Sequence, residues 1–183
     1  MYRSGTYLLD PHFILEESHT REGMRVADFG CGRTGHFTFP ISQKVGDKGC
    51  VYAVDILKDV LHNVESRKRG KGLKNIHTVW ADIEKLGAVT IPKNSLDIVF
   101  IVNTLSQSSF KADILNEASR LMKNKSRLVI VDWHRGSHKF GVSQDLLVNF
   151  SELGDWGVEN NFVVQDSIVA GPHHAGIILY KHE

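Results

Sequence analysis

Three glycines and one acid lie close together in the stretch VADFGCGRTGHFTFP, residues 26–40. Gly30, Gly32 and Gly35 form the pattern G-x-G-x-x-G, and Asp28 precedes the first of them. Glycine permits tight turns and lets a ligand approach the main chain closely. Loops of this kind hold dinucleotides, nucleoside triphosphates or S-adenosylmethionine, so the loop alone leaves three classes of ligand open.

Two further acids favour one of these ligands. Asp55 comes 20 residues after the third glycine, where a carboxylate could hold ribose hydroxyls, although this spacing also fits a dinucleotide. Asp82 could accept a hydrogen bond from an adenine amino group, while Ile83 would offer its N–H and apolar side chain to the ring. The carboxylate of Asp28 has no favourable interaction with a pyrophosphate, but it suits the positive sulfonium and ammonium groups of S-adenosylmethionine. The three acids together favour S-adenosylmethionine, and the chain contains no G-x-x-x-x-G-K-[ST] motif.

Three neighbouring residues complete the predicted cofactor-binding set. Cys31 lies between two of the glycines, Ile56 follows Asp55, and Asn103 follows a later apolar run. Cys31 is interpreted as a small residue that fills the loop rather than as a nucleophile.

Histidines gather in two segments that could supply a base. His134 and His138 occur in DWHRGSH, and His173 and His174 occur in GPHHAG. Because histidine titrates near neutral pH, His134, His173 and His174 are candidate catalytic residues, together with Asn103. A metal site is the less favoured interpretation of the His134-x-x-x-His138 spacing, and we predict no bound metal. Solvated loop histidines are the non-functional alternative.

Apolar runs alternate with amphipathic segments along the chain. Strands are expected at residues 24–29, 49–56, 75–82, 95–103 and 126–133, with a hairpin over 161–182. Helices are expected at 8–19, opening near Asp10-Pro11, then from the glycine loop to about Lys44, and at 57–70, 111–123 and 143–153. This order predicts an α/β fold, a three-layer αβα sandwich around a seven-stranded, mostly parallel sheet with one antiparallel strand in the C-terminal hairpin. The glycine loop and the acids would then share the edge where the parallel strands end.

The composition indicates a cytoplasmic, enzyme-sized domain. The 183 residues suit one domain, and 22 basic against 21 acidic side chains leave a net charge of +1. No global field therefore favours nucleic acid or a membrane, and the basic run SRKRGKGLK is interpreted as a solvated helix end. The segment MYRSGTYLLDPH does not resemble a signal peptide, and no apolar run reaches the ~18 residues of a membrane span.

The chain resembles class I S-adenosylmethionine-dependent methyltransferases in the order of its motifs. These motifs are VADFGCG, VYAVDI, ADIEKL, LDIVFIVN, LMKNKSRLVIVDW and GPHHAGIILYK. The likeness runs from about Leu9 to Lys181 and is closest to the small bacterial and archaeal branch similar to the quinone-biosynthesis type, the type 11 and type 31 groups. The resemblance implies a Rossmann-like fold, S-adenosylmethionine as cofactor, and methyl transfer to an acceptor, with a small molecule slightly favoured. Asn103 would lie near the transferred methyl group.

One departure from the family's loop concerns Gly35. The family usually places one residue between the second and third glycines, but here Arg33 and Thr34 both intervene. A bulge in the loop would accommodate the extra residue, and a close helix–strand contact is the alternative role for Gly35.

The whole chain, residues 1–183, is predicted to form one methyltransferase domain, with residues 1–22 as an N-terminal tail and helix and residues 23–183 as the Rossmann-like core. So small a core leaves little room for an inserted lid. The mouth of the site would be open, closed by residues 1–12, or closed by a second subunit in a homodimer. Two other functions stay open, a nicotinamide-dependent oxidoreductase and a non-catalytic partner subunit that binds S-adenosylmethionine.

Overall fold

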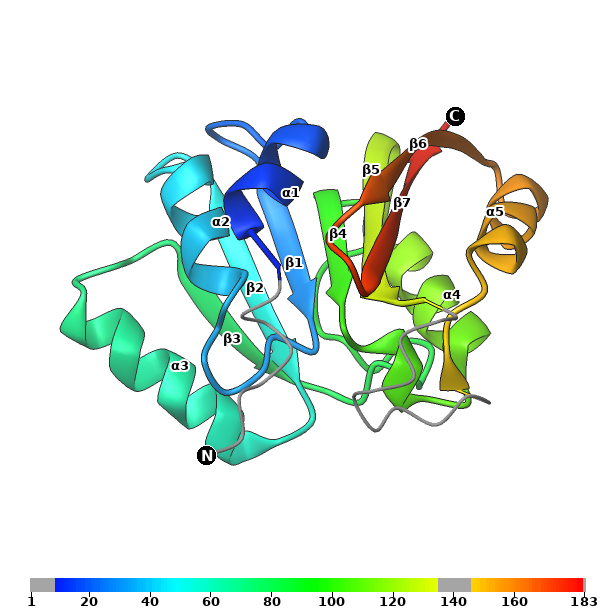
Figure 1. Cartoon of the computed structure of the whole chain (residues 1–183). Helices are drawn as coiled ribbons and strands as arrows, with labels where there is room; N and C mark the ends of the chain where they lie inside the picture. Colours follow the sequence, from blue (N-terminus) through cyan, green and yellow to red (C-terminus); the bar gives the residue numbers. More distant parts are fainter. Residues whose placement is uncertain (1–8, 135–145, 183) are drawn as a thin grey trace.

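The computed structural model describes residues 9–134 and 146–182, which form a seven-stranded sheet with helices on both faces (Figure 1). The strands are β1 (Arg25–Phe29), β2 (Cys50–Asp55), β3 (Ile76–Trp80), β4 (Leu96–Val102), β5 (Met122–Trp133), β6 (Phe162–Val169) and β7 (His174–Lys181). They lie in the order β3-β2-β1-β4-β5-β7-β6. β7 runs antiparallel to β5 and β6, whereas the other neighbouring pairs are parallel. The predicted fold class is confirmed.

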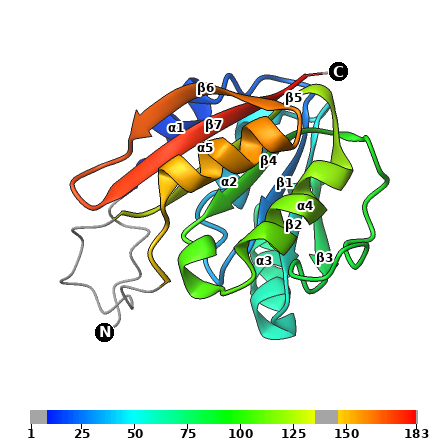
Figure 2. The same ribbon diagram turned by 90° about the vertical axis from the view of Figure 1, so that its right-hand side faces the viewer.

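The helices of the described residues form two layers. α1 (Pro11–Glu17), α2 (Thr38–Val45) and α3 (Lys58–Gly70) cover one face, and α4 (Lys111–Leu121) and α5 (Phe150–Glu159) cover the other. Figure 2 shows α4 and α5 together on the side that faces the viewer. None of these helices has the length and apolar composition needed to cross a bilayer. Because β1 to β5 run parallel to one another, the loops that follow these strands lie at the same edge of the sheet.

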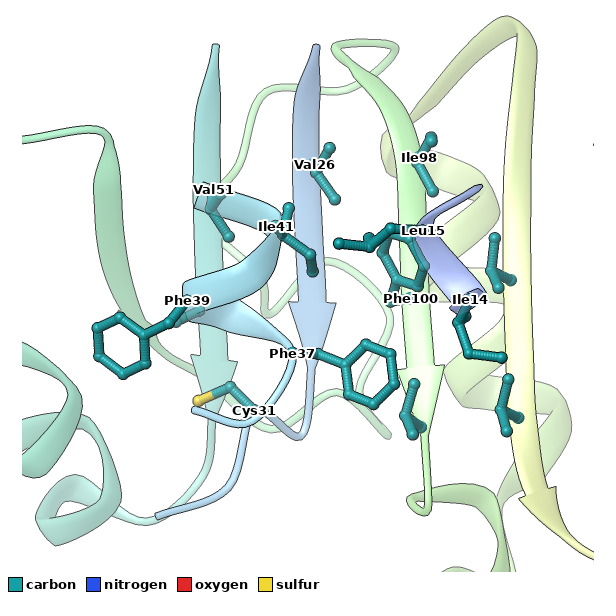
Figure 3. Packing of buried hydrophobic residues seen from close by; sticks show 14 of the residues in the cluster. Ile14, Leu15, Val26, Cys31, Phe37, Phe39, Ile41, Val51, Ile98 and Phe100 are labelled. Atoms are coloured by element: carbon teal, nitrogen blue, oxygen red, sulfur yellow. The ribbon is translucent and has the colours of Figure 1, made fainter. Parts of the chain in front are cut away.

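The central strands are buried on both faces. Ile14 and Leu15 of α1 pack with Val26 of β1 and Phe100 of β4 in one core cluster (Figure 3). The alternate residues of the same strands, such as Phe29, belong to a second cluster beneath α4 and α5. Strands covered on both sides are continuous apolar runs, which is why the sequence pattern predicted them.

The first helix begins where predicted. The Asp10 carboxylate caps α1 by accepting a hydrogen bond from the N–H of His12 at 2.9 Å, and Pro11 occupies the first helical position. Among the other predicted boundaries before residue 134, the largest difference is at the start of β5. This strand begins at Met122, directly after α4 ends, and not at the predicted residue 126.

The predicted helix over residues 143–153 was wrong in its position. Residues 143–145 lie outside the described residues, and α5 begins only at Phe150. Asn149 caps this helix, because its side-chain oxygen accepts a hydrogen bond from the N–H of Ser151 at 3.2 Å.

α5 also extends beyond the predicted end, past two glycines. A Cβ at Gly157 would lie 3.2 Å from Leu179 Cδ2, and one at Gly154 would lie 3.4 Å from Val164 Cγ2. The two glycines therefore let the helix pack closely on β6 and β7 instead of ending it.

We predict that Asn149→Ala lowers the free energy of unfolding by about 1 kcal/mol, because the first turn of α5 loses its side-chain cap. Urea denaturation measures this change, and Asn149→Asp should retain most of the stability. A gain in stability for the alanine variant would contradict the assignment, since alanine is favoured inside a helix but not at its cap.

Candidate functional site

The glycine loop joins β1 to α2 at the edge where the parallel strands end. Gly30, Gly32 and Gly35 have φ angles of 72°, 65° and 56°, which other residues rarely adopt. A Cβ at Gly30 would lie 2.5 Å from Thr104 Oγ1, and one at Gly35 would lie 2.8 Å from Phe39 Cε2. A Cβ at Gly32 would meet only the carbonyl oxygen of Gly30, at 3.9 Å. Gly30 and Gly35 thus permit close packing, whereas Gly32 leaves its main chain open to a ligand.

The extra residue of the loop is held from α3. Arg33 pairs with Asp59 at 2.6 Å, and the Arg67 guanidinium donates a hydrogen bond to the carbonyl oxygen of Thr34. The same guanidinium lies over the ring of Phe39, 4.6 Å from its centre. The basic end of α3 therefore supports the glycine loop, in addition to facing solvent.

A cleft of about 490 Å³ opens in front of the loop. Its walls come from the glycine loop, from the segments after β2, β3 and β4, and from one residue each of α3 and α4. The lining residues are Gly30, Gly32, Arg33, Asp55, Ile56, Leu57, Val60, Asp82, Ile83, Glu84, Thr104, Gln107, Ser108 and Ile114. Of the predicted cofactor-binding residues, the cleft brings together Gly30, Gly32, Asp55, Ile56, Asp82 and Ile83.

Three carboxylates give this cleft a negative character. Asp55 accepts hydrogen bonds from the N–H of Gly32 at 3.2 Å and from the N–H of Leu57, just before α3, at 3.0 Å. Asp82 accepts one from the N–H of Glu84, and Glu84 accepts one from the Ser108 hydroxyl at 2.6 Å. Such a cleft suits a cationic ligand better than a pyrophosphate.

Asp28 lies behind the glycine loop and does not line the cleft. Its carboxylate is 2% exposed and accepts a hydrogen bond from the hydroxyl of Thr38, in the first turn of α2, at 2.6 Å. Burial raises the pKa of Asp28 to about 6, and the bond from Thr38 opposes this rise. Asp28 thus joins β1 to α2, while its contribution at the methionine end of a cofactor stays a prediction.

Cys31 is also buried and outside the cleft lining. Its thiol lies 4.0 Å from the Asp55 carboxylate, and burial raises its pKa, with a further rise from the charges of Asp28 and Asp55. A thiol kept protonated in this way is a poor nucleophile. Figure 3 shows Cys31 at the margin of the apolar cluster.

Asn103 and the candidate histidines lie at the ends of β4, β5 and β7. Asn103 has a φ of 52°, and its side-chain oxygen is buried without a hydrogen-bond partner. His174 pairs with Trp133 across β7 and β5, with ring centres 4.1 Å apart. The N–H of His134 donates to the carbonyl oxygen of His173 at 3.4 Å. The three predicted histidines therefore meet at one end of the sheet.

His138 lies outside the described residues. In the part of the chain that the structure describes, no three His, Cys, Asp or Glu side chains are arranged to hold a metal ion. The catalytic roles of Asn103 and the histidines stay predictions.

Comparison with known proteins assigns the family. The sequence profile of a family described as a methyltransferase domain matches residues 20–169, which is most of the chain. The chain belongs to this methyltransferase family. The resemblance to class I S-adenosylmethionine-dependent methyltransferases is thereby confirmed, with S-adenosylmethionine as the cofactor that the family implies.

The fold of the chain matches a solved structure along nearly its whole length. The crystal structure of a SAM dependent methyltransferase from Aquifex aeolicus is 26% identical with a TM-score of 0.84, covering 98% of this chain and 93% of that one. The ubiquinone/menaquinone biosynthesis C-methyltransferase UbiE of Azotobacter vinelandii is 33% identical over 135 residues, 73% of this chain and 52% of its own. The aklanonic acid methyltransferase DauC of Streptomyces sp. (strain C5) is 30% identical over 112 residues, 59% and 50% of the two chains. The chain thus spans about half the length of the curated relatives it matches.

Several residues that line the cleft were missed by the sequence reasoning. Leu57 and Glu84 come directly after predicted site residues, so their nearness to a strand end could have identified them. Gln107 and Ser108 belong to or follow the 3₁₀ turn Leu105–Gln107 after β4, which no pattern predicted.

A buried ion pair on α4 fixes the loop that follows β3. Glu117 is fully buried, and its carboxylate accepts hydrogen bonds from the N–H groups of Gly87 at 2.8 Å and Val89 at 2.9 Å. Arg120 donates to the same carboxylate and to the carbonyl oxygen of Val89. Burial opposes ionisation, but these bonds hold the pKa of Glu117 below its ordinary value. The pair thereby positions residues 82–84, which begin the same loop, without lining the cleft itself.

We predict that Asp28→Asn becomes progressively more stable, relative to the natural chain, between pH 4 and pH 7. The raised pKa means that Asp28 stays protonated in the folded state at pH values where it is already ionised in the unfolded state. Ionisation of the unfolded state therefore lowers the stability of the natural chain as the pH rises towards 6. The difference should change by up to about 3 kcal/mol in favour of the variant. Urea denaturation at several pH values measures it, and a difference that does not change with pH would contradict the prediction.

We predict that Glu117→Gln lowers the free energy of unfolding by about 3 kcal/mol, because the Arg120 side chain, which is only 16% exposed, loses its counter-charge. Amide hydrogen exchange at Gly87 and Val89 should quicken more than elsewhere in the sheet. Glu65→Gln is the matched control, since Glu65 pairs with Lys68 at the same spacing on α3 but is 33% exposed. A loss in the control equal to that in Glu117→Gln would show that burial does not set the effect.

Proposed function

We propose that this methyltransferase transfers the methyl group of S-adenosylmethionine to a small-molecule acceptor. The row of carboxylates formed by Asp55, Asp82 and Glu84 carries the proposal, because it suits a ligand with positive charge. The names of the relatives UbiE and DauC support a small acceptor, since they refer to ubiquinone/menaquinone biosynthesis and to aklanonic acid.

The residues of the cleft fit this cofactor. Asp55 would hold the ribose hydroxyls, Asp82 would accept from the adenine amino group, and Ile56 and Ile83 would contact the ring. The open main chain at Gly32 would let the amino-acid part approach closely. When bound, S-adenosylmethionine supplies an electrophilic methyl group on a sulfonium.

The acceptor would lie beyond the cleft, near Asn103 and the three histidines. Methyl transfer is an in-line displacement, so the chain contributes chiefly by orienting the acceptor and excluding water. An acceptor that loses a proton also needs a base, for which His134, His173 or His174 would serve. In this proposal residues 23–183 form one catalytic core, and residues 1–22 form its N-terminal tail and helix.

The direct test is calorimetry with S-adenosylhomocysteine and, separately, with NAD. We expect the chain to bind S-adenosylhomocysteine, and Asp55→Ala to weaken this binding by about 10- to 100-fold, because charged hydrogen bonds to ribose are lost. Asp47→Ala removes an exposed acid in the turn between α2 and β2, remote from the cleft, and should leave the affinity unchanged.

The alternatives give different results in the same experiments. Tight binding of NAD without a response to S-adenosylhomocysteine would favour an oxidoreductase. Binding of S-adenosylhomocysteine without methylation of any small-molecule, RNA or protein pool would favour a non-catalytic subunit. Methylation confined to the RNA or protein pool would overturn the small-molecule acceptor while leaving the methyltransferase activity in place.

A further inference from the structure

Two buried polar groups at the edge of the sheet that carries the cleft have no hydrogen-bond partner in the described structure. The imidazole of His174 is 1% exposed, and both of its ring nitrogens are unpartnered. The side-chain oxygen of Asn103 is buried and unpartnered as well. Buried polar groups in native proteins are nearly always matched, and an unmatched one costs about 1–3 kcal/mol. Two such groups at the same end of one sheet indicate a place for a ligand.

The strand order puts both groups at the edge of the sheet where the cleft opens. Thr104, the residue after Asn103, lines the cleft. The N–H of Asn103 donates to the carbonyl oxygen of Val131 on β5, and further along β5 Trp133 pairs with His174 on β7. A molecule that extends from the Thr104 end of the cleft across β5 would therefore reach Asn103 and His174.

The hydrogen-bonding capacity of these groups selects the chemistry of that molecule. A neutral imidazole offers one N–H donor and one lone pair, and the Asn103 oxygen only accepts. A hydroxyl group both donates and accepts, whereas an ammonium group only donates and a carboxylate only accepts. Burial, and then the charges of His173 and His134, lower the pKa of His174 to about 4, so the imidazole is neutral near pH 7. The burial of His174 also disfavours an ion that brings no counter-charge.

We propose that the acceptor is an uncharged, hydroxyl-bearing molecule whose hydroxyl group hydrogen-bonds to His174. The proposal deepens the methyltransferase function proposed above and rests on it. Trp133, itself nearly buried, packs against the His174 ring and limits its rotation, so the imidazole is held ready for a partner. Asn103 accepts a second hydrogen bond from the same molecule.

The test measures binding rather than turnover, with the chain saturated with S-adenosylhomocysteine. The probes are phenol, anisole, benzoate and benzylammonium, which share a ring and differ in the polar group. Nuclear magnetic resonance of the His174 imidazole reports the contact, and its titration gives each dissociation constant. We expect phenol to bind at least about tenfold more tightly than the other three probes.

Three variants separate recognition from structure. His174→Phe keeps a flat ring beside Trp133 and should reduce phenol binding to the level of anisole, with an unchanged affinity for S-adenosylhomocysteine. His174→Gln keeps a donor and an acceptor and should retain part of the preference. His62→Phe alters an exposed histidine on α3 and should change neither affinity.

Equal binding of phenol and anisole overturns the proposal, as do undetectable binding of phenol and a preference for phenol that survives in His174→Phe. The methyltransferase function still stands in those cases if S-adenosylhomocysteine binds. If S-adenosylhomocysteine fails to bind, the proposed function fails instead, and the same titrations on the unloaded chain decide whether His174 recognises hydroxyl groups.

Discussion

Parallel pairing of β1 with β2 on one side and β4 on the other is the constraint on which the site depends. Parallel strands end at the same edge of a sheet, so residues far apart in the chain come to line one cleft. Gly30 follows β1, Asp55 ends β2, and Thr104 follows β4. The hydrogen bond from the N–H of Gly32 to Asp55 then fixes the glycine loop against the end of β2. The loop and the acid are therefore held together by a main-chain donor and a side-chain carboxylate.

The acids of the cleft are held largely by uncharged donors. Asp55 accepts from main-chain N–H groups, and Glu84 accepts from a hydroxyl. Arg33 lines the cleft, but it pairs with Asp59 on α3 and not with an acid of the cleft. Lys85 pairs with Asp82 from an exposed position, where such a pair is weak. The negative charge of the cleft is thus left largely available to a ligand, while the carboxylates remain fixed.

The strands of the sheet, and Asp55 and Asp82 in the cleft, were predictable because apolar runs and strand ends are local features of a sequence. The direction in which the Asp28 side chain points was not predictable, because the pattern of a strand buried on both faces does not show which side chains face α2. The start of α5 depended on a single cap, Asn149, and its length on glycines that pack against the sheet. The contact between Glu117 and the loop after β3 joins segments about 30 residues apart and leaves no periodic signal.

The way in which Glu117 and Arg120 grip this loop has an evolutionary consequence. Glu117 accepts from the N–H groups of Gly87 and Val89, and Arg120 donates to the carbonyl oxygen of Val89. These are main-chain groups, and every residue except proline carries both of them. The path of the loop is therefore independent of most of its own side chains. Substitutions at the surface of the loop could change the adjacent lining of the cleft while Glu117 and Arg120 stay the same. The ligand preference can then change in evolution without a change of fold.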